Sequence, residues 1–293
     1  YDNPDGWKQG IYMPPVPAWI REQNAVLRSP ASKIVAATEQ GISPAISPTG
    51  NTPADNTPAE LVKPLAQVNT GCDQLNQWLF AEARKALLAG KKVGVLGGDH
   101  CVPLGALQAL AEQYSDFGIL HIDAHCDLRD AYQGFRFSHA SIMRNVLKLT
   151  QVSKLVQVAI RDASPKEIAF AASDERVVIH HDSELKRSRY KGTPWHTLCR
   201  QIVADLPAHV YISFDIDGLD PKLCPGTGTP VPGGLELEEA FCLLREVADS
   251  RKIIGFDLCE VGPDEWDGNV GARIVYKLSN LMGLYPNLIG GGE

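Results

Sequence analysis

Acidic and histidine residues follow four separate apolar runs in this 293-residue sequence. They form the segments 97–100 (Gly-Gly-Asp-His), 123–127 (Asp-Ala-His-Cys-Asp) and 215–217 (Asp-Ile-Asp), together with Glu260. In parallel α/β sheets the ligand site lies beyond the carboxyl ends of the strands. If the apolar runs are parallel strands of one sheet, we therefore expect the four segments to meet in one crevice.

The spacing within these segments predicts that the side chains cluster. Asp123, His125 and Asp127 occupy alternate positions, and so do Asp215 and Asp217. Alternate side chains of extended backbone point to the same side. Carboxylates crowded at the end of an apolar strand repel one another when ionised, unless cations neutralise them. The pattern therefore favours a metal site.

The candidate ligands are numerous enough for two divalent ions. Two-metal hydrolases hold their ions about 3.5–4 Å apart with an activated water between them. A set of ligands that is rich in oxygen, with some nitrogen and no thiolate, suits Mn²⁺, and the ligand types do not exclude Ni²⁺, Co²⁺ or Fe²⁺. Taken singly, an Asp-x-Asp pair is more often a helix cap and a lone histidine a packed core residue, but the joint pattern argues against both. The candidate metal ligands are His100, Asp123, His125, Asp127, Asp215 and Asp217.

Apolar runs and amphipathic segments alternate through the region that carries these motifs. Such alternation predicts an α/β fold with a mostly parallel sheet and helices on both faces. The expected strands are 92–96, 118–122, 155–160, 177–179, 210–214 and 253–256. The expected helices are 72–89, 104–113, 140–149, 165–172, 195–203, 238–248 and 270–281.

The first part of the chain looks different. Residues 1–69 are rich in Pro, Asn and Gly, with one amphipathic stretch at 18–27 and a proline-dotted loop at 43–58. We expect a loosely structured N-terminal arm over 1–69, followed by a single catalytic domain over 70–293.

Composition excludes several classes of partner. The formal net charge of −7 argues against a surface for nucleic acid or anionic lipid. No apolar run reaches the ~20 residues that span a bilayer. The seven cysteines form no Cys-x-x-Cys pair, which favours a reducing, cytoplasmic compartment. Because the sequence starts at Tyr1 without Met, the presence of a targeting segment before Tyr1 stays an open question.

The motifs resemble a known family. The segments 97–100, 123–127 and 213–221 are similar to the three signature motifs of the ureohydrolases, which include arginases, agmatinases and formiminoglutamases. The loop 225–230 and the segment 257–261 extend this resemblance, which covers about 92–284. It implies a three-layer arginase-like fold, a binuclear metal centre, a small guanidino or formimino substrate, and a homo-oligomer, either a trimer or a hexamer.

The resemblance also implies roles for individual residues. His100, Asp123, Asp127 and Asp215 would hold one ion with shared carboxylates, and His125 and Asp217 would complete the other. Glu260 would pair with the substrate guanidinium. His139 is similar to the family's proton-shuttling or substrate-orienting histidine, and either it or Asp127 would protonate the leaving amine.

The substrate depends on the residues after the second motif. The small polar residues with which arginases hold an α-amino acid are absent there, and Arg129 resembles an arginine of formiminoglutamases that can bind a substrate carboxylate. A structural ion pair of Arg129 with Asp130 or Asp220 is the alternative. The loop 226–230 is closer to the arginase and agmatinase branch, which favours urea release over formamide release.

Two further classes compete with a ureohydrolase. A one-metal zinc deacetylase of a related fold would need only about three ligands, and all six candidates are present. A catalytically silent metal-binding scaffold of the same fold would be expected to have lost a ligand. An active amidinohydrolase is therefore the prediction.

Overall fold

A computed structural model describes residues 10–42, 44 and 57–283. Its centre is a six-stranded sheet in the order β1-β6-β5-β2-β3-β4, with every neighbouring pair parallel. The strands are β1 (Val93–Leu96), β2 (Phe117–Ile122), β3 (Val152–Ile160), β4 (Val177–His181), β5 (His209–Asp215) and β6 (Lys252–Cys259). The predicted parallel sheet is confirmed.

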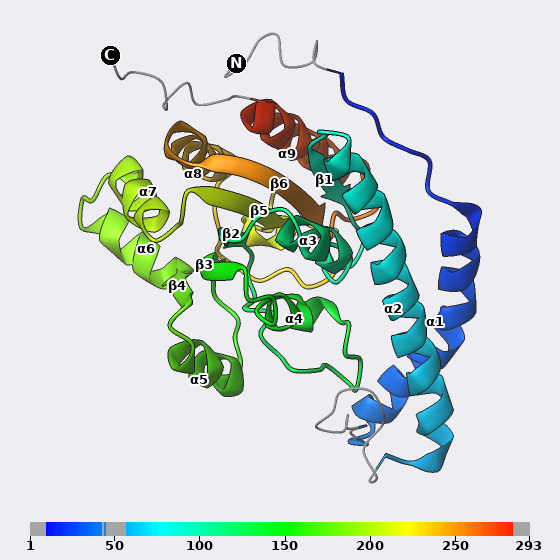
Figure 1. The fold of residues 1–293 in the computed structure, drawn as a ribbon. Coiled ribbons are helices and arrows are strands. Elements are labelled where there is room, and N and C mark those ends of the chain that lie inside the picture. Colours follow the sequence, from blue (N-terminus) through cyan, green and yellow to red (C-terminus); the bar gives the residue numbers. More distant parts are fainter. Residues whose placement is uncertain (1–9, 43, 45–56, 284–293) are drawn as a thin grey trace.

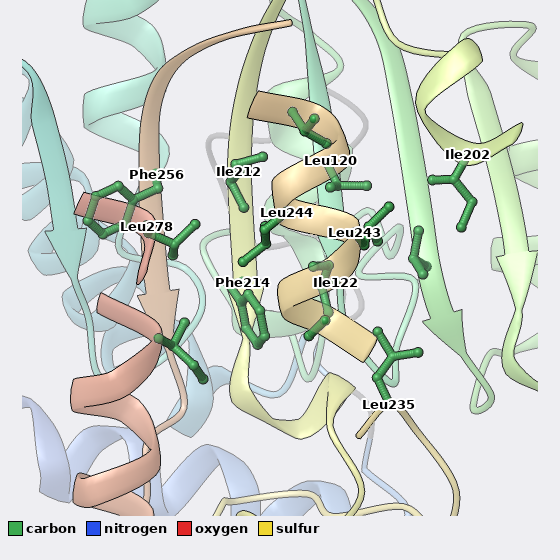
Figure 2. Close-up of a cluster of buried hydrophobic side chains, with 14 of the residues drawn as sticks. Leu120, Ile122, Ile202, Ile212, Phe214, Leu235, Leu243, Leu244, Phe256 and Leu278 are labelled. Carbon is green, nitrogen blue, oxygen red and sulfur yellow. The ribbon is translucent and has the colours of Figure 1, made fainter. Parts of the chain in front are cut away.

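Helices cover both faces of this sheet (Figure 1). On one face, α6 (Asp182–Tyr190), α7 (Trp195–Ala204), α8 (Leu237–Ser250) and α9 (Glu265–Gly283) pack on the strands. Figure 2 shows this core, where Leu244 and Leu278 lie against Ile212, Phe214 and Phe256. The opposite face is covered by α2 (Ala59–Leu88), α3 (Leu104–Ala111), α4 (Ile142–Val146) and α5 (Pro165–Ser173).

Two helices lie in or extend into the first part of the chain, where the sequence analysis expected only an amphipathic stretch. The helix α1 (Ala18–Glu39) and the start of α2 lie within residues 1–69, where we expected a loosely structured arm. Pro30 and Pro64 lie inside these helices rather than ending them. The two helices run side by side (Figure 1), and packing of Ile34 against Leu61 and Leu65 stabilises them. The division at residue 69 stays a prediction.

Some sequence predictions lie outside the described residues. Most of the proline-dotted loop at 43–58 does so, and so does the start of the chain, where a targeting segment was left open. Within the described part, no helix is both long and apolar enough to cross a membrane.

The helix α3 must approach α2 very closely. A Cβ atom at Gly105 would lie 2.3 Å from the carbonyl oxygen of Asn76 and 2.8 Å from the backbone nitrogen of Phe80. Both neighbours are backbone atoms of α2, so a side-chain rotation cannot relieve the contact. Since α3 directly follows the turn that carries His100, this contact helps to set the position of that turn.

We predict that Gly105→Ala lowers the free energy of unfolding by about 1–3 kcal/mol, the usual cost of overpacking. Gly268 of α9 is the matched control, because a Cβ there would meet nothing within 4 Å. Gly268→Ala should raise the free energy of unfolding by up to about 1 kcal/mol through helix propensity. Urea unfolding of both variants checks the opposite signs, and equal changes would contradict the close packing.

Candidate active site

The strand order brings the four polar segments to one edge of the sheet. Strands β1, β6, β5 and β2 are consecutive neighbours, and all of them run in the same direction. The segments that follow these strands are the four identified from the sequence. The expected convergence is therefore explained by the order in which the strands pair.

One half of the cluster surrounds His100, whose side chain is completely buried. Its Nδ1 atom lies 3.2 Å from a carboxylate oxygen of Asp123, 3.4 Å from one of Asp127 and 3.2 Å from one of Asp215. Three carboxylates from two strand ends, those of β2 and β5, thus face one ring nitrogen. A divalent ion placed among these oxygens would also have an imidazole ligand.

The other ring nitrogen of His100 faces into the protein. Its Nε2 atom lies 2.8 Å from the hydroxyl of Ser213, which in turn donates to Oδ1 of Asp257 at 3.1 Å. The Asp257 side chain is fully buried. Hydrogen bonds of this kind orient a histidine ligand, which leaves Nδ1 of His100 for the cluster.

The second half of the cluster surrounds His125. Its Nδ1 atom lies 3.3 Å from Oδ1 of Asp123 and 3.2 Å from Oδ2 of Asp217. The other oxygen of Asp217 accepts a hydrogen bond from the backbone N–H of Ala124 at 3.1 Å. Asp123 therefore lies between the two imidazoles, with one oxygen towards each. This is the geometry expected of a carboxylate shared by two ions.

The backbone is strained where two of the site residues lie. Asp127 has a φ of 54° and Glu260 a φ of 60°, in the left-handed region that side chains other than glycine seldom adopt. Such strain persists only where surrounding contacts enforce it, and it is concentrated at functional sites. Here it follows the ends of β2 and β6, where each side chain is directed into the site.

The imidazoles near the buried carboxylates do not supply enough positive charge to balance them. Burial raises the pKa of Asp215, and the negative charges of Asp123 and Asp217 raise it further. Burial and the charge of Asp123 likewise raise the pKa of Asp127. Although burial lowers it, hydrogen bonds with Asp123 and Asp217 raise the pKa of His125 to about 11. The cluster therefore attracts positive charge strongly, and its donor set fits divalent cations.

A cavity of about 230 Å³ opens next to this cluster. Glu260 forms part of its wall, and its Oε1 atom accepts a hydrogen bond from the backbone N–H of His100 at 2.8 Å. The hydroxyl of Thr227 donates to the carbonyl oxygen of Glu260 at 2.8 Å, which holds the strained residue in place. The residues that line the cavity are Asp99, His125, Asp127, His139, Asp215, Gly228, Thr229 and Glu260.

His139 lies at the cavity in the short 3₁₀ helix His139–Ser141. Its Nδ1 atom lies 3.3 Å from Oδ2 of Asp99, and this hydrogen bond raises the pKa of His139. The ring of Tyr132 meets the His139 ring edge-on, with centroids 5.6 Å apart. His139 is thus oriented from two sides at the cavity wall.

Arg129 is placed differently from the other predicted site residues. Its Nε atom lies 3.5 Å from Oε2 of Glu167, and its guanidinium stacks 4.7 Å from the centre of the Tyr132 ring. It is not among the residues that line the cavity. The structure thus pairs Arg129 with Glu167, rather than with Asp130 or Asp220.

Sequence reasoning missed several residues that the structure brings to the site. His121 is buried with its Nε2 atom 2.8 Å from Oδ2 of Asp123, and Asp99 and Thr229 line the cavity. The alternate spacing that grouped Asp123 with His125 extends back to His121, and this signal could have found it. Asp257 had no such signal, because its contact with Ser213 joins two strands.

A parallel α/β sheet with a buried cluster of imidazoles and carboxylates at its carboxyl edge is the arrangement of an α/β enzyme whose site could hold metal ions. The chain belongs to the arginase family, whose model matches residues 17–280. This confirms the resemblance inferred from the motifs, and it confirms the enzyme class as a hydrolase acting on C–N bonds of linear amidines.

Curated relatives support this assignment. The chain is 36% identical to an N(1)-aminopropylagmatine ureohydrolase of Thermus thermophilus, over 76% of this chain and 73% of the relative. It is 36% identical to an agmatinase of Cronobacter sakazakii, over 75% and 68% of the two chains.

A solved structure agrees with the fold. The proclavaminate amidinohydrolase of Streptomyces clavuligerus superposes with a TM-score of 0.64 at 31% identity, covering 73% of this chain and 71% of that one. The predicted arginase-like fold is therefore confirmed.

We predict that Asp99→Asn lowers the pKa of His139, because the amide cannot balance the imidazolium charge. The pKa of His139 is higher in the folded protein than the value of about 6.5 expected in the unfolded chain. The ion pair therefore stabilises the fold fully when the pH lies below about 6.5, and this stabilisation is lost as the pH rises through the pKa of the folded state. The variant should therefore be more destabilised, relative to wild type, at pH 6 than at pH 9 in urea unfolding. An equal loss at both values would show that the two groups are not coupled.

Proposed function

We propose that this chain is a two-metal ureohydrolase that releases urea from a cationic guanidino compound of the agmatine type. The observation that carries the proposal is the cavity next to the buried cluster. Four carboxylates and two imidazoles line it, and no lysine or arginine is among its lining residues. Such a wall favours a positively charged substrate.

The six predicted ligands support a pair of divalent ions. Two groups of possible ligand atoms share Asp123. One group also holds His100, His121 and Asp127, the other holds His125 and Asp217, and within each group the atoms lie within 4.8 Å of one another. When bound, two such ions supply Lewis acidity that lowers the pKa of a water at neutral pH. We expect Mn²⁺, because the donors are mainly carboxylate oxygens.

Protein side chains would orient the reaction. Asp127 lines the cavity and lies in the cluster, so its carboxylate can accept a hydrogen bond from the attacking water and orient it. The amine that leaves needs a proton, and Asp127 or His139 can donate one. Glu260 faces the same cavity, where its carboxylate can pair with the planar guanidinium.

The wall of the cavity bears on the choice between substrates. A formimino substrate with a carboxylate tail would need a cation such as Arg129, but Glu167 and Tyr132 already engage that guanidinium. The printed names of the relatives, agmatinase and N(1)-aminopropylagmatine ureohydrolase, support a substrate whose tail is an amine. We therefore place agmatine-like compounds ahead of arginine, guanidinobutyrate and formiminoglutamate.

Assembly and location stay predictions. The family resemblance leads us to expect a homo-oligomer, a trimer or a hexamer, and cysteine usage leads us to expect a cytoplasmic protein. The small-molecule substrate is the partner that the cavity supports.

The proposal is tested by measuring urea from the Mn²⁺-loaded protein with agmatine, arginine and guanidinobutyrate, and formamide from formiminoglutamate. We expect urea from agmatine-like compounds. Asp127→Asn should lower kcat roughly 10²- to 10⁴-fold, the usual contribution of a positioned acid or base. Formamide release would assign the chain to the formimino branch, and no product from a protein that binds metal would favour the silent scaffold.

We predict that Glu260→Gln raises KM for the guanidino substrate roughly 10- to 150-fold, since a hydrogen bond to a charged group is worth about 1.5–3 kcal/mol. Glu112→Gln is the matched control, because Glu112, at the end of α3, pairs with Arg84 of α2 and neither residue lines the cavity. Steady-state kinetics measure both variants. An unchanged KM in Glu260→Gln would remove Glu260 from substrate binding.

Removal of the metal is expected to abolish turnover. Dialysis against a chelator should reduce urea release to background, and added Mn²⁺ should restore it, because the water is then activated again. Full activity in protein shown to be metal-free by elemental analysis would contradict the proposed mechanism.

A further inference from the structure

His121 has the contacts of a possible seventh metal ligand. It is completely buried on β2, and its Nε2 atom lies 2.8 Å from Oδ2 of Asp123. Its ring centre lies 5.3 Å from that of His100, and its nitrogen belongs to one of the groups whose geometry could hold an ion. Whether His121 binds metal depends on which of its ring nitrogens carries the proton.

A side chain on the neighbouring strand β3 determines which ring nitrogen of His121 carries the proton. Gln157 on β3 pairs in register with His121, is fully buried, and places its Nε2 atom 2.8 Å from Nδ1 of His121. The same amide nitrogen donates to the carbonyl oxygen of Cys126 at 2.7 Å. Because a carbonyl oxygen can only accept, the amide must turn its NH₂ group, and not its oxygen, towards this position.

The orientation of Gln157 fixes the proton on His121. The Nδ1 atom of His121 faces an NH₂ group, so it must accept, and the proton of the neutral ring lies on Nε2. That N–H group points at Oδ2 of Asp123. A flip of Gln157 would free Nδ1 to donate, but it would set the amide oxygen against the carbonyl of Cys126. The lone pair needed for metal binding is therefore absent from Nε2.

We propose that His121 is not a ligand but a positioning residue that holds the shared carboxylate of Asp123. The inference builds on the two-metal centre proposed above. The Oδ2 atom of Asp123 accepts from His121, and its Oδ1 atom accepts from the backbone N–H of His125 at 2.6 Å. With one donor on each oxygen, the carboxylate plane is fixed and both oxygens keep a lone pair for an ion.

The test is metal affinity, measured by competition between the full-length protein and a chromophoric chelator for Mn²⁺. We expect His121→Leu to weaken Mn²⁺ binding about 10- to 100-fold, the usual effect of removing a residue that orients a ligand. His121→Gln, which restores an amide donor on this strand, should recover part of the loss. Gln157→Leu leaves His121 in place but removes the amide donor that keeps the ring proton on Nε2. This variant should weaken Mn²⁺ binding by roughly 10-fold.

The Co²⁺ spectrum distinguishes positioning from ligation. At saturating Co²⁺, His121→Leu should keep the visible bands of wild type, because the ligands are the same. Shifted bands would show that His121 is a ligand, and affinities within twofold of wild type in both His121→Leu and Gln157→Leu would show that it has no role. If His121→Leu does not fold, Gln157→Leu alone decides. If wild type binds no Mn²⁺, the proposed function fails before this inference is reached.

Discussion

Four aspartate carboxylates lie buried at one edge of the sheet, and the rest of the site is arranged around their mutual repulsion. The two imidazoles of His100 and His125 each face them through Nδ1 at 3.2–3.4 Å, yet cannot balance four negative charges. Unpaired buried charge is among the most costly features of a fold. Divalent ions would remove this cost, so we propose that the same residues that would destabilise the chain alone give it an affinity for metal.

The sheet topology makes this concentration of charge possible. Residues far apart in the sequence meet because β1, β6, β5 and β2 are consecutive neighbours in a parallel sheet. The apolar strands and the helices on both faces supply the stability that offsets the charged edge. Strained backbone at Asp127 and Glu260 then turns both side chains towards the cavity, which joins the carboxylate cluster to the cavity wall.

Local patterns made the sheet and the clustering of the candidate metal ligands predictable. Alternate spacing at the end of an apolar run is a signal that one segment carries by itself, as in Asp123 and Asp127. The role of His121 depends on Gln157, which lies 36 residues away on a neighbouring strand, so no local pattern records it. The same holds for Arg129, whose partner Glu167 belongs to α5. Only the start of helix α1 was marked, as the amphipathic stretch at 18–27, because the Pro, Asn and Gly content of residues 1–69 favoured a loose arm and the packing against α2 has no local signal.

The central claim is that this carboxylate edge holds two ions that share Asp123. Crystals grown with Mn²⁺ and measured at its absorption edge test it directly through anomalous difference maps. We predict two peaks about 3.5–4 Å apart, one beside Nδ1 of His100 and one beside Nδ1 of His125, with Asp123 between them. A single peak, or none within the cluster, would contradict the account.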